Sequence, residues 1–171
     1  LSLGLTLLRE TFNTWSPTYF VEVAGSSSAQ AASQSALFPL LGGVSVILAG
    51  WLGDRLGRSG RALVMLGGCA LTTVVLWLLG SLSLSGHTVA PILLVGLAGF
   101  LMLGPYSYLA GAISLDLGGK RGGATACGII DGVGYLGGML AGESVARLSI
   151  AYNWSGAFRA LAVVALLTSL A

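Results

Sequence analysis

Two ionisable side chains stand inside long apolar stretches of this sequence. Arg9 lies 13 residues before Glu22, and Asp131 lies about eight residues into a second apolar stretch. With a helical rise of about 1.5 Å per residue and a hydrocarbon core about 30 Å thick, both charges are predicted at similar depth in a membrane. A charge at the bilayer centre costs about 2.5–3.5 kcal/mol on insertion scales, so each should face a cavity or a partner.

Arg9 suits the capture of an anion. Its guanidinium presents a planar fork of donors that fits phosphate or carboxylate. The structural alternative is a base paired with Glu10 or Asp131. Asn13 follows at i+4 on the same helical face, where an amide could contact a ligand or a neighbouring helix.

Asp131 has three open interpretations: it neutralises Arg9 when the site is empty, carries a coupling proton, or bonds to a neighbouring helix. Tyr135 stands one helical turn beyond it and adds a phenolic donor to the same face. The candidate substrate-binding residues are therefore Arg9, Asn13, Asp131 and Tyr135.

The composition fixes the kind of chain that must position these residues. Of 171 residues, 55% are hydrophobic and 8% are charged, and the mean hydropathy is +0.90. Soluble domains carry roughly 25% charged residues. The sequence predicts an all-α, polytopic membrane helical bundle, and its few charges give no reason to expect a nucleic-acid partner.

Six apolar segments follow one another, and the four internal ones are each long enough to span a membrane. Because Leu1 and Ala171 stand inside apolar runs, we expect the first and last helices to be truncated. The predicted segments are residues 1–21, 30–52, 61–82, 89–113, 123–146 and 154–171.

The bases predict the orientation of these segments. Three arginines lie in or just after residues 53–60, and Lys120 and Arg121 lie in residues 115–122, whereas the connection at 83–87 has neither Lys nor Arg. Cytoplasmic loops carry such an excess, so both basic loops are predicted to face the cytoplasm. Three pairs of glycines at four-residue spacing in one segment predict close helix packing: Gly128/Gly132, Gly134/Gly138 and Gly138/Gly142.

One charged turn carries a recognisable pattern. It runs Gly-x-Leu-x-Asp-Arg-x-Gly-Arg, followed by a further base, between two apolar runs. The pattern resembles the signature loop of the major facilitator superfamily, in the position between the eighth and ninth of twelve helices. The residues concerned are Gly50, Asp54, Arg55, Gly57, Arg58 and Arg61. The resemblance implies a conformational switch in which Asp54 braces against the start of the eleventh helix while Arg55 and Arg58 bond across the cytoplasmic side.

Arg9 narrows the resemblance to a family within that superfamily. Arg9 followed by Trp15-Ser16-Pro17-Thr18-Tyr19 is similar to the seventh helix of the organophosphate:phosphate antiporters, the group of glycerol-3-phosphate and hexose-phosphate transporters. Leu103-Gly104-Pro105-Tyr106 resembles their tenth helix, and Gly134-Tyr135-Leu136-Gly137-Gly138 their eleventh. The sequence departs at Leu103, where glycerol-phosphate transporters have tyrosine, and at Asp131, where they have glycine.

The resemblance implies what the protein does. Arg9 would bind the substrate phosphate opposite a second arginine from an N-terminal half, and Tyr135 would line the same pocket. Residues 1–171 would be the C-terminal six-helix half of a twelve-helix transporter in a plasma or bacterial inner membrane, with an organelle membrane as the alternative. The expected activity is exchange of glycerol phosphate or a sugar phosphate for inorganic phosphate by alternating access.

Two alternatives remain within this scaffold, a membrane sensor of sugar phosphate and a proton-coupled symporter of another organic anion in which Asp131 takes the proton. An enzyme is not expected, because no Ser has a nearby base at depth. Neither a cofactor nor a metal is expected, since the sequence has one His and no His/Glu metal spacing.

Overall fold

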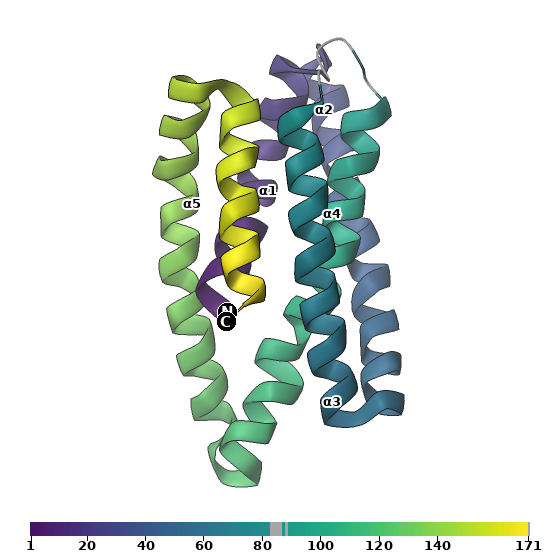
Figure 1. Ribbon diagram of the computed structural model, residues 1–171, viewed down its shortest axis with the longest axis vertical. Coiled ribbons are helices and arrows are strands. Elements are labelled where there is room, and N and C mark those ends of the chain that lie inside the picture. Colours follow the sequence, from purple (N-terminus) through teal and green to yellow (C-terminus); the bar gives the residue numbers. More distant parts are fainter. Residues whose placement is uncertain (83–86, 88, 171) are drawn as a thin grey trace.

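The computed structural model describes residues 1–82, 87 and 89–170, except the side chain of Lys120. The chain is a bundle of roughly parallel and antiparallel helices (Figure 1). The helices are α1 (Ser2–Glu22), α2 (Ser28–Ser35), α3 (Leu37–Ser81), α4 (Val89–Tyr108), the π-helical turn η1 (Leu109–Ile113) and α5 (Ser114–Ser169). The connection predicted at 83–87 falls largely outside the described residues.

Three residues with positive φ reverse the chain inside the long helices. Gly57 divides α3 (φ 66°), and Gly119 and Asn153 divide α5 (φ 59° and 57°). In Figure 1 the turns near residues 57 and 119 lie at one end of the bundle and the turn near 153 at the other. The connections expected as loops at 53–60 and 115–122 are therefore tight turns flanked by helix, and they share one end of the bundle, as predicted.

A short helix precedes α3 at the other end. The Ser27 hydroxyl accepts a hydrogen bond from the backbone N–H of Gln30 at 3.3 Å. The side-chain oxygen of Gln30 accepts one from the backbone N–H of Ser27 at 3.1 Å. This capping box starts α2. The segment predicted as one helix over 30–52 is divided at Ala36, and Pro39 stands in the first turn of α3, where its missing N–H costs little.

α1 packs in parallel against the part of α5 between Gly119 and Asn153. Ser2 donates to the Ile130 carbonyl at 2.7 Å, and the Trp15 indole donates to the Ala141 carbonyl at 3.0 Å. A Cβ at Gly137 would lie 2.1 Å from the Leu3 carbonyl oxygen, so the backbones meet here only because this residue is glycine. Of the glycines predicted to permit close packing, Gly134 and Gly138 contact α1, while Gly128, Gly132 and Gly142 face open space.

This register corrects the predicted depth of Asp131. Ser2 bonds to Ile130 and Glu10 lies against Gly138, so Asp131 is level with the start of α1, about two helical turns from Arg9 along the bundle. The prediction of similar depth was wrong because the depth of Arg9 was counted from Glu22 at one end of the bundle, while that of Asp131 was counted from the start of its own segment at the other end. Residues 120–152 form one continuous helix of about 50 Å, longer than the assumed 30 Å core.

α3 and α4 pack just as closely. A Cβ at Gly99 would lie 2.3 Å from the Phe38 carbonyl oxygen, and one at Gly104 would lie 2.3 Å from the Ser45 hydroxyl. The Tyr108 hydroxyl donates to the Ala49 carbonyl, at the same end of the bundle as the Gly57 turn. These contacts fix the Gly57 turn relative to the end of α4.

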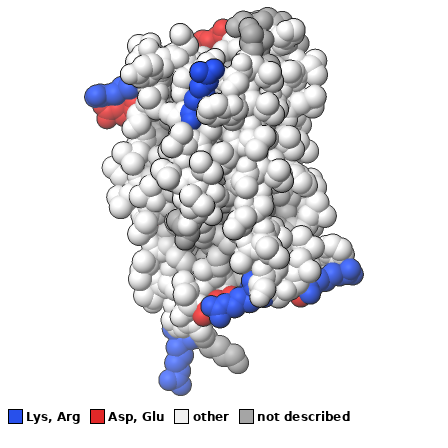
Figure 2. All heavy atoms as spheres, in the orientation of Figure 1, with Lys and Arg blue, Asp and Glu red and all other residues white. Residues whose placement is uncertain are grey.

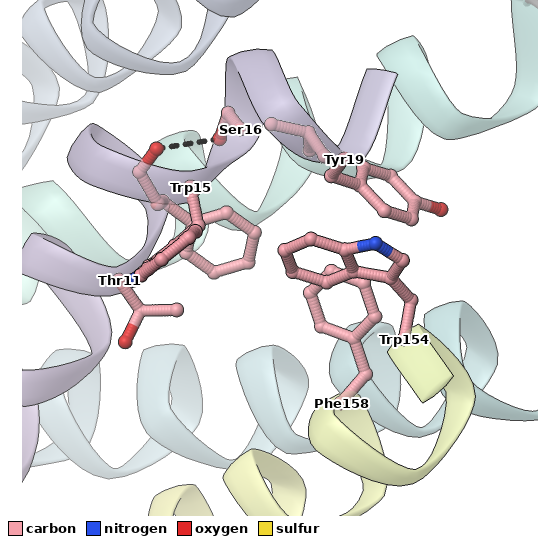
Figure 3. Close-up of a pocket in the computed structure, with 8 residues that line it drawn as sticks. Thr11, Trp15, Ser16, Tyr19, Trp154 and Phe158 are labelled. Atoms are coloured by element: carbon pink, nitrogen blue, oxygen red, sulfur yellow. Dashed lines mark hydrogen bonds between the residues drawn. The ribbon is translucent and has the colours of Figure 1, made fainter. Parts of the chain in front are cut away.

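An aromatic cluster joins α1 to the last part of α5 (Figure 3). Tyr19 meets Phe158 edge-on with ring centroids 4.9 Å apart and Trp154 at 5.5 Å. The Trp154 indole also donates to the Glu22 carboxylate at 2.6 Å. The cavity among these rings is about 10 Å³, room for about one water molecule, so Trp15, Tyr19 and Trp154 are packing residues.

Charged side chains lie at the two ends of the face seen in Figure 2, with a broad uncharged band between them. Among the described residues, three helical stretches are long and apolar enough to cross a membrane, Ser28–Ser81, Val89–Gly119 and Arg121–Ser169. α1, expected to span as well, is not one of them, and it carries the charges of Arg9, Glu10 and Glu22.

Candidate functional site

Arg9 is held between two partners on different helices. Its Nε and Nη2 donate to the Glu10 carboxylate at 3.0 and 2.6 Å. Its guanidinium carbon lies 4.7 Å from the centroid of the Tyr106 ring of α4. The ring quadrupole attracts the cation at this distance. Arg9 keeps 24% of its side chain exposed, so the guanidinium is oriented and still accessible.

The other predicted site residues surround Arg9 only in part. Tyr135 is 64% exposed and lies on the α5 segment that packs against α1, about one helical turn from Arg9. Asn13 is exposed on α1, one turn beyond Arg9. Asp131 accepts a hydrogen bond from the Cys127 thiol at 3.6 Å. Among the described side chains, the partner of Arg9 is Glu10 and not Asp131.

The charged turn of α3 is linked to the first turn of α5, just before the reversal at Gly119. Arg61 Nη2 lies 3.1 Å from an Asp116 carboxylate oxygen, and Arg58 Nε lies 3.9 Å from the same oxygen. The Arg61 stem and the Tyr108 ring both lie close to Gly53, where an added Cβ would come within 3.0–3.2 Å of them. One carboxylate of α5 thus holds two arginines from the part of α3 that follows Gly57, at the end of the bundle where both turns lie.

The remaining residues of the charged turn, which was predicted to be a conformational switch, are not part of the ion pairs with Asp116. Arg55 stacks over Trp51 with its guanidinium carbon 4.1 Å from the ring centroid. Gly57 supplies the left-handed turn, and Gly50 faces open space. Asp54 is exposed, and the ion pairs between described residues do not include it. The carboxylate that bridges the turns in this structure is Asp116, where the resemblance implied Asp54.

Sequence reasoning missed the roles of Tyr106 and Asp116. Tyr106 belongs to a stretch quoted for the family resemblance and Asp116 to the second basic connection, but neither was assigned a contact. An acidic residue in the second basic turn was the available signal for Asp116. For Tyr106 the signal was an aromatic residue beside Pro105 at membrane depth. Glu143 and Arg147 form the exposed i, i+4 pair expected of surface residues.

Comparison with known proteins agrees with this architecture. A family model described as Major Facilitator Superfamily matches residues 1–142. The chain is 30% identical over 148 residues to the glycerol-3-phosphate transporter of Bacillus subtilis, which covers 84% of this chain and 32% of that protein. It is 27% identical over 172 residues to a probable hexose phosphate transport protein of Chlamydia muridarum, covering 99% of this chain and 37% of that protein.

A third relative has a different described role. The chain is 28% identical over 167 residues to the membrane sensor protein UhpC of Escherichia coli, covering 96% of this chain and 37% of that protein. The chain therefore spans about a third of the length of the curated relatives it matches.

A helical bundle with long apolar spans and a charged signature turn defines a membrane transporter scaffold, and the chain belongs to the major facilitator superfamily. Within the superfamily it is of the organophosphate:phosphate antiporter type. It is a multi-pass integral membrane protein of a transporter class rather than an enzyme class.

Proposed function

We propose that the full-length protein moves glycerol phosphate or a sugar phosphate across the membrane in exchange for inorganic phosphate. The observation that carries the proposal is Arg9, whose guanidinium is oriented by Tyr106 and remains partly exposed. Arg is favoured where a phosphate is recognised by two parallel hydrogen bonds. The carriers of glycerol 3-phosphate and hexose phosphate among the relatives support this choice of solute.

In this proposal residues 1–171 form the C-terminal six-helix half of a twelve-helix transporter. The missing half supplies a second arginine, and the two halves rock about a central site by alternating access. Tyr135, Asn13 and Asp131 line the path of the solute from α1 and α5. Phosphate drives the switch by binding the occluded state more tightly than either open state.

The bonds from Arg58 and Arg61 to Asp116 act as the switch. They hold the two turns together in one conformation and break in the other. Asp54 contributes only in the conformation not seen here.

The test is counterflow in proteoliposomes that contain the full-length protein. Vesicles loaded with inorganic phosphate should accumulate labelled glycerol 3-phosphate or glucose 6-phosphate, and phosphate-free vesicles should not. Uptake that ignores internal phosphate but follows a proton gradient would overturn exchange in favour of symport. The E. coli sensor relative supports a second candidate function, for which binding of the phosphate ester without uptake is the expected result.

A further inference from the structure

We infer that Glu10 is an internal competitor for the substrate, a carboxylate that occupies the anion-binding edge of Arg9 until a phosphate displaces it. This inference rests on the proposed function and assigns Glu10 a role in setting the affinity and release of the bound anion.

The geometry of the Arg9–Glu10 contact is that of a bound ligand. Both Nε and Nη2 of Arg9 donate to one Glu10 oxygen, at 3.0 and 2.6 Å. This edge of the guanidinium is the one that a phosphate oxygen would take in a two-point contact. Because Glu10 already occupies this edge, a phosphate that uses it must first remove the carboxylate.

The pair is also easy to open. Consecutive residues on a helix point about 100° apart and do not face each other, so only the side-chain ends of Arg9 and Glu10 converge. Rotation about side-chain bonds is enough to separate them, and α1 keeps its backbone hydrogen bonds. Exposed fractions of 24% and 30% leave both side chains reachable.

α5 provides the space in which Glu10 moves. A Cβ at Gly138 would lie 3.2 Å from the Glu10 Cγ, so glycine at this position leaves room for the Glu10 stem. The charged and titratable groups on the packed elements include Tyr106 and Tyr108 on α4, and Cys127, Asp131, Tyr135, Glu143 and Arg147 on α5. Among the described side chains none of these donates a hydrogen bond to Glu10, so Arg9 is its only cationic partner.

Competition by Glu10 makes a specific kinetic prediction. Removing the carboxylate charge of Glu10 should strengthen phosphate binding. It should also slow phosphate release, because the Glu10 carboxylate can no longer return to Arg9 and displace the phosphate. Loss of one competing charge-assisted hydrogen bond between partly exposed groups predicts about a tenfold tighter binding. In counterflow, Glu10→Gln should therefore lower both KM and kcat.

The experiment measures binding of inorganic phosphate to the purified full-length protein by isothermal titration, with Glu10→Gln, Glu10→Ala and Arg9→Ala. Glu143→Gln is the matched control, since it neutralises an exposed carboxylate paired with Arg147 on α5. Tighter binding in either Glu10 variant, with the control unchanged, supports the inference. Unchanged or weaker binding in both folded Glu10 variants overturns it and leaves the proposed function intact. If the unaltered protein does not bind phosphate, or if Arg9→Ala binds as well as it does, the proposed function fails together with the inference.

Discussion

Arg61 of α3 donates to Asp116 at 3.1 Å across 55 positions of sequence, and Arg58, the residue directly after Gly57, lies 3.9 Å from the same carboxylate. The contact joins the two turns that share one end of the bundle. It is the only place in the described part of the chain where one carboxylate holds two arginines.

Replacing Asp116 with Asn should release the two turns from each other. Partly exposed ion pairs contribute about 0.2–1 kcal/mol each, so losing two should shift the conformational equilibrium by about two- to thirtyfold. Cysteines introduced on the inner and outer sides of the full-length protein would report the shift as altered rates of thiol labelling. Asp54→Asn is the comparison variant and should shift the equilibrium in the opposite direction, because Asp54 contributes in the other conformation. A shift equal in size and direction to that of Asp116→Asn would contradict the assignment of the bridge to Asp116.

Gly57 and Gly50 should respond in opposite directions to alanine. Gly57 has φ 66°, and a Cβ in the left-handed region costs about 1–2 kcal/mol. Gly50 is helical and faces open space, so Gly50→Ala should stabilise by about 0.5–1 kcal/mol. Thermal unfolding in detergent checks both changes, and a Gly57→Ala variant as stable as the parent would show that the turn is not as described.

The contact of α1 with α5 should be sensitive to a single methyl group. Gly137→Ala places a carbon 2.1 Å from the Leu3 carbonyl, and such overpacking costs about 1–3 kcal/mol. Gly128→Ala, at a position that faces open space, should not lower Tm. Equal Tm values for the two variants would contradict the close approach of these helices.

Trp154 should stabilise the end of the bundle opposite the Gly57 turn through its hydrogen bond to Glu22. Trp154→Phe keeps an aromatic ring but loses that donor, and a hydrogen bond to a charged group contributes about 1.5–3 kcal/mol. We expect a lower Tm for Trp154→Phe than for Trp77→Phe, whose ring is 54% exposed. A smaller loss at Trp154 than at Trp77 would rule out this role.

The sequence was sufficient for the class of fold because apolar stretches and clustered bases are local signals. The signature turn and Arg9 were identified for the same reason. Contacts between distant segments were not predictable in this way. Asp116 meets Arg61 only because two turns share one end of the bundle, and Asp131 lies away from Arg9 because the packing of α1 on Gly134, Gly137 and Gly138 sets the register.

The central claim is that Arg9 binds the phosphate group, and counterflow of labelled glycerol 3-phosphate into phosphate-loaded proteoliposomes tests it directly. Arg9→Lys keeps the charge but removes the planar fork, so uptake should fall at least tenfold, while Arg147→Lys, at an exposed pair, should transport normally. Full exchange activity in Arg9→Lys would contradict the account.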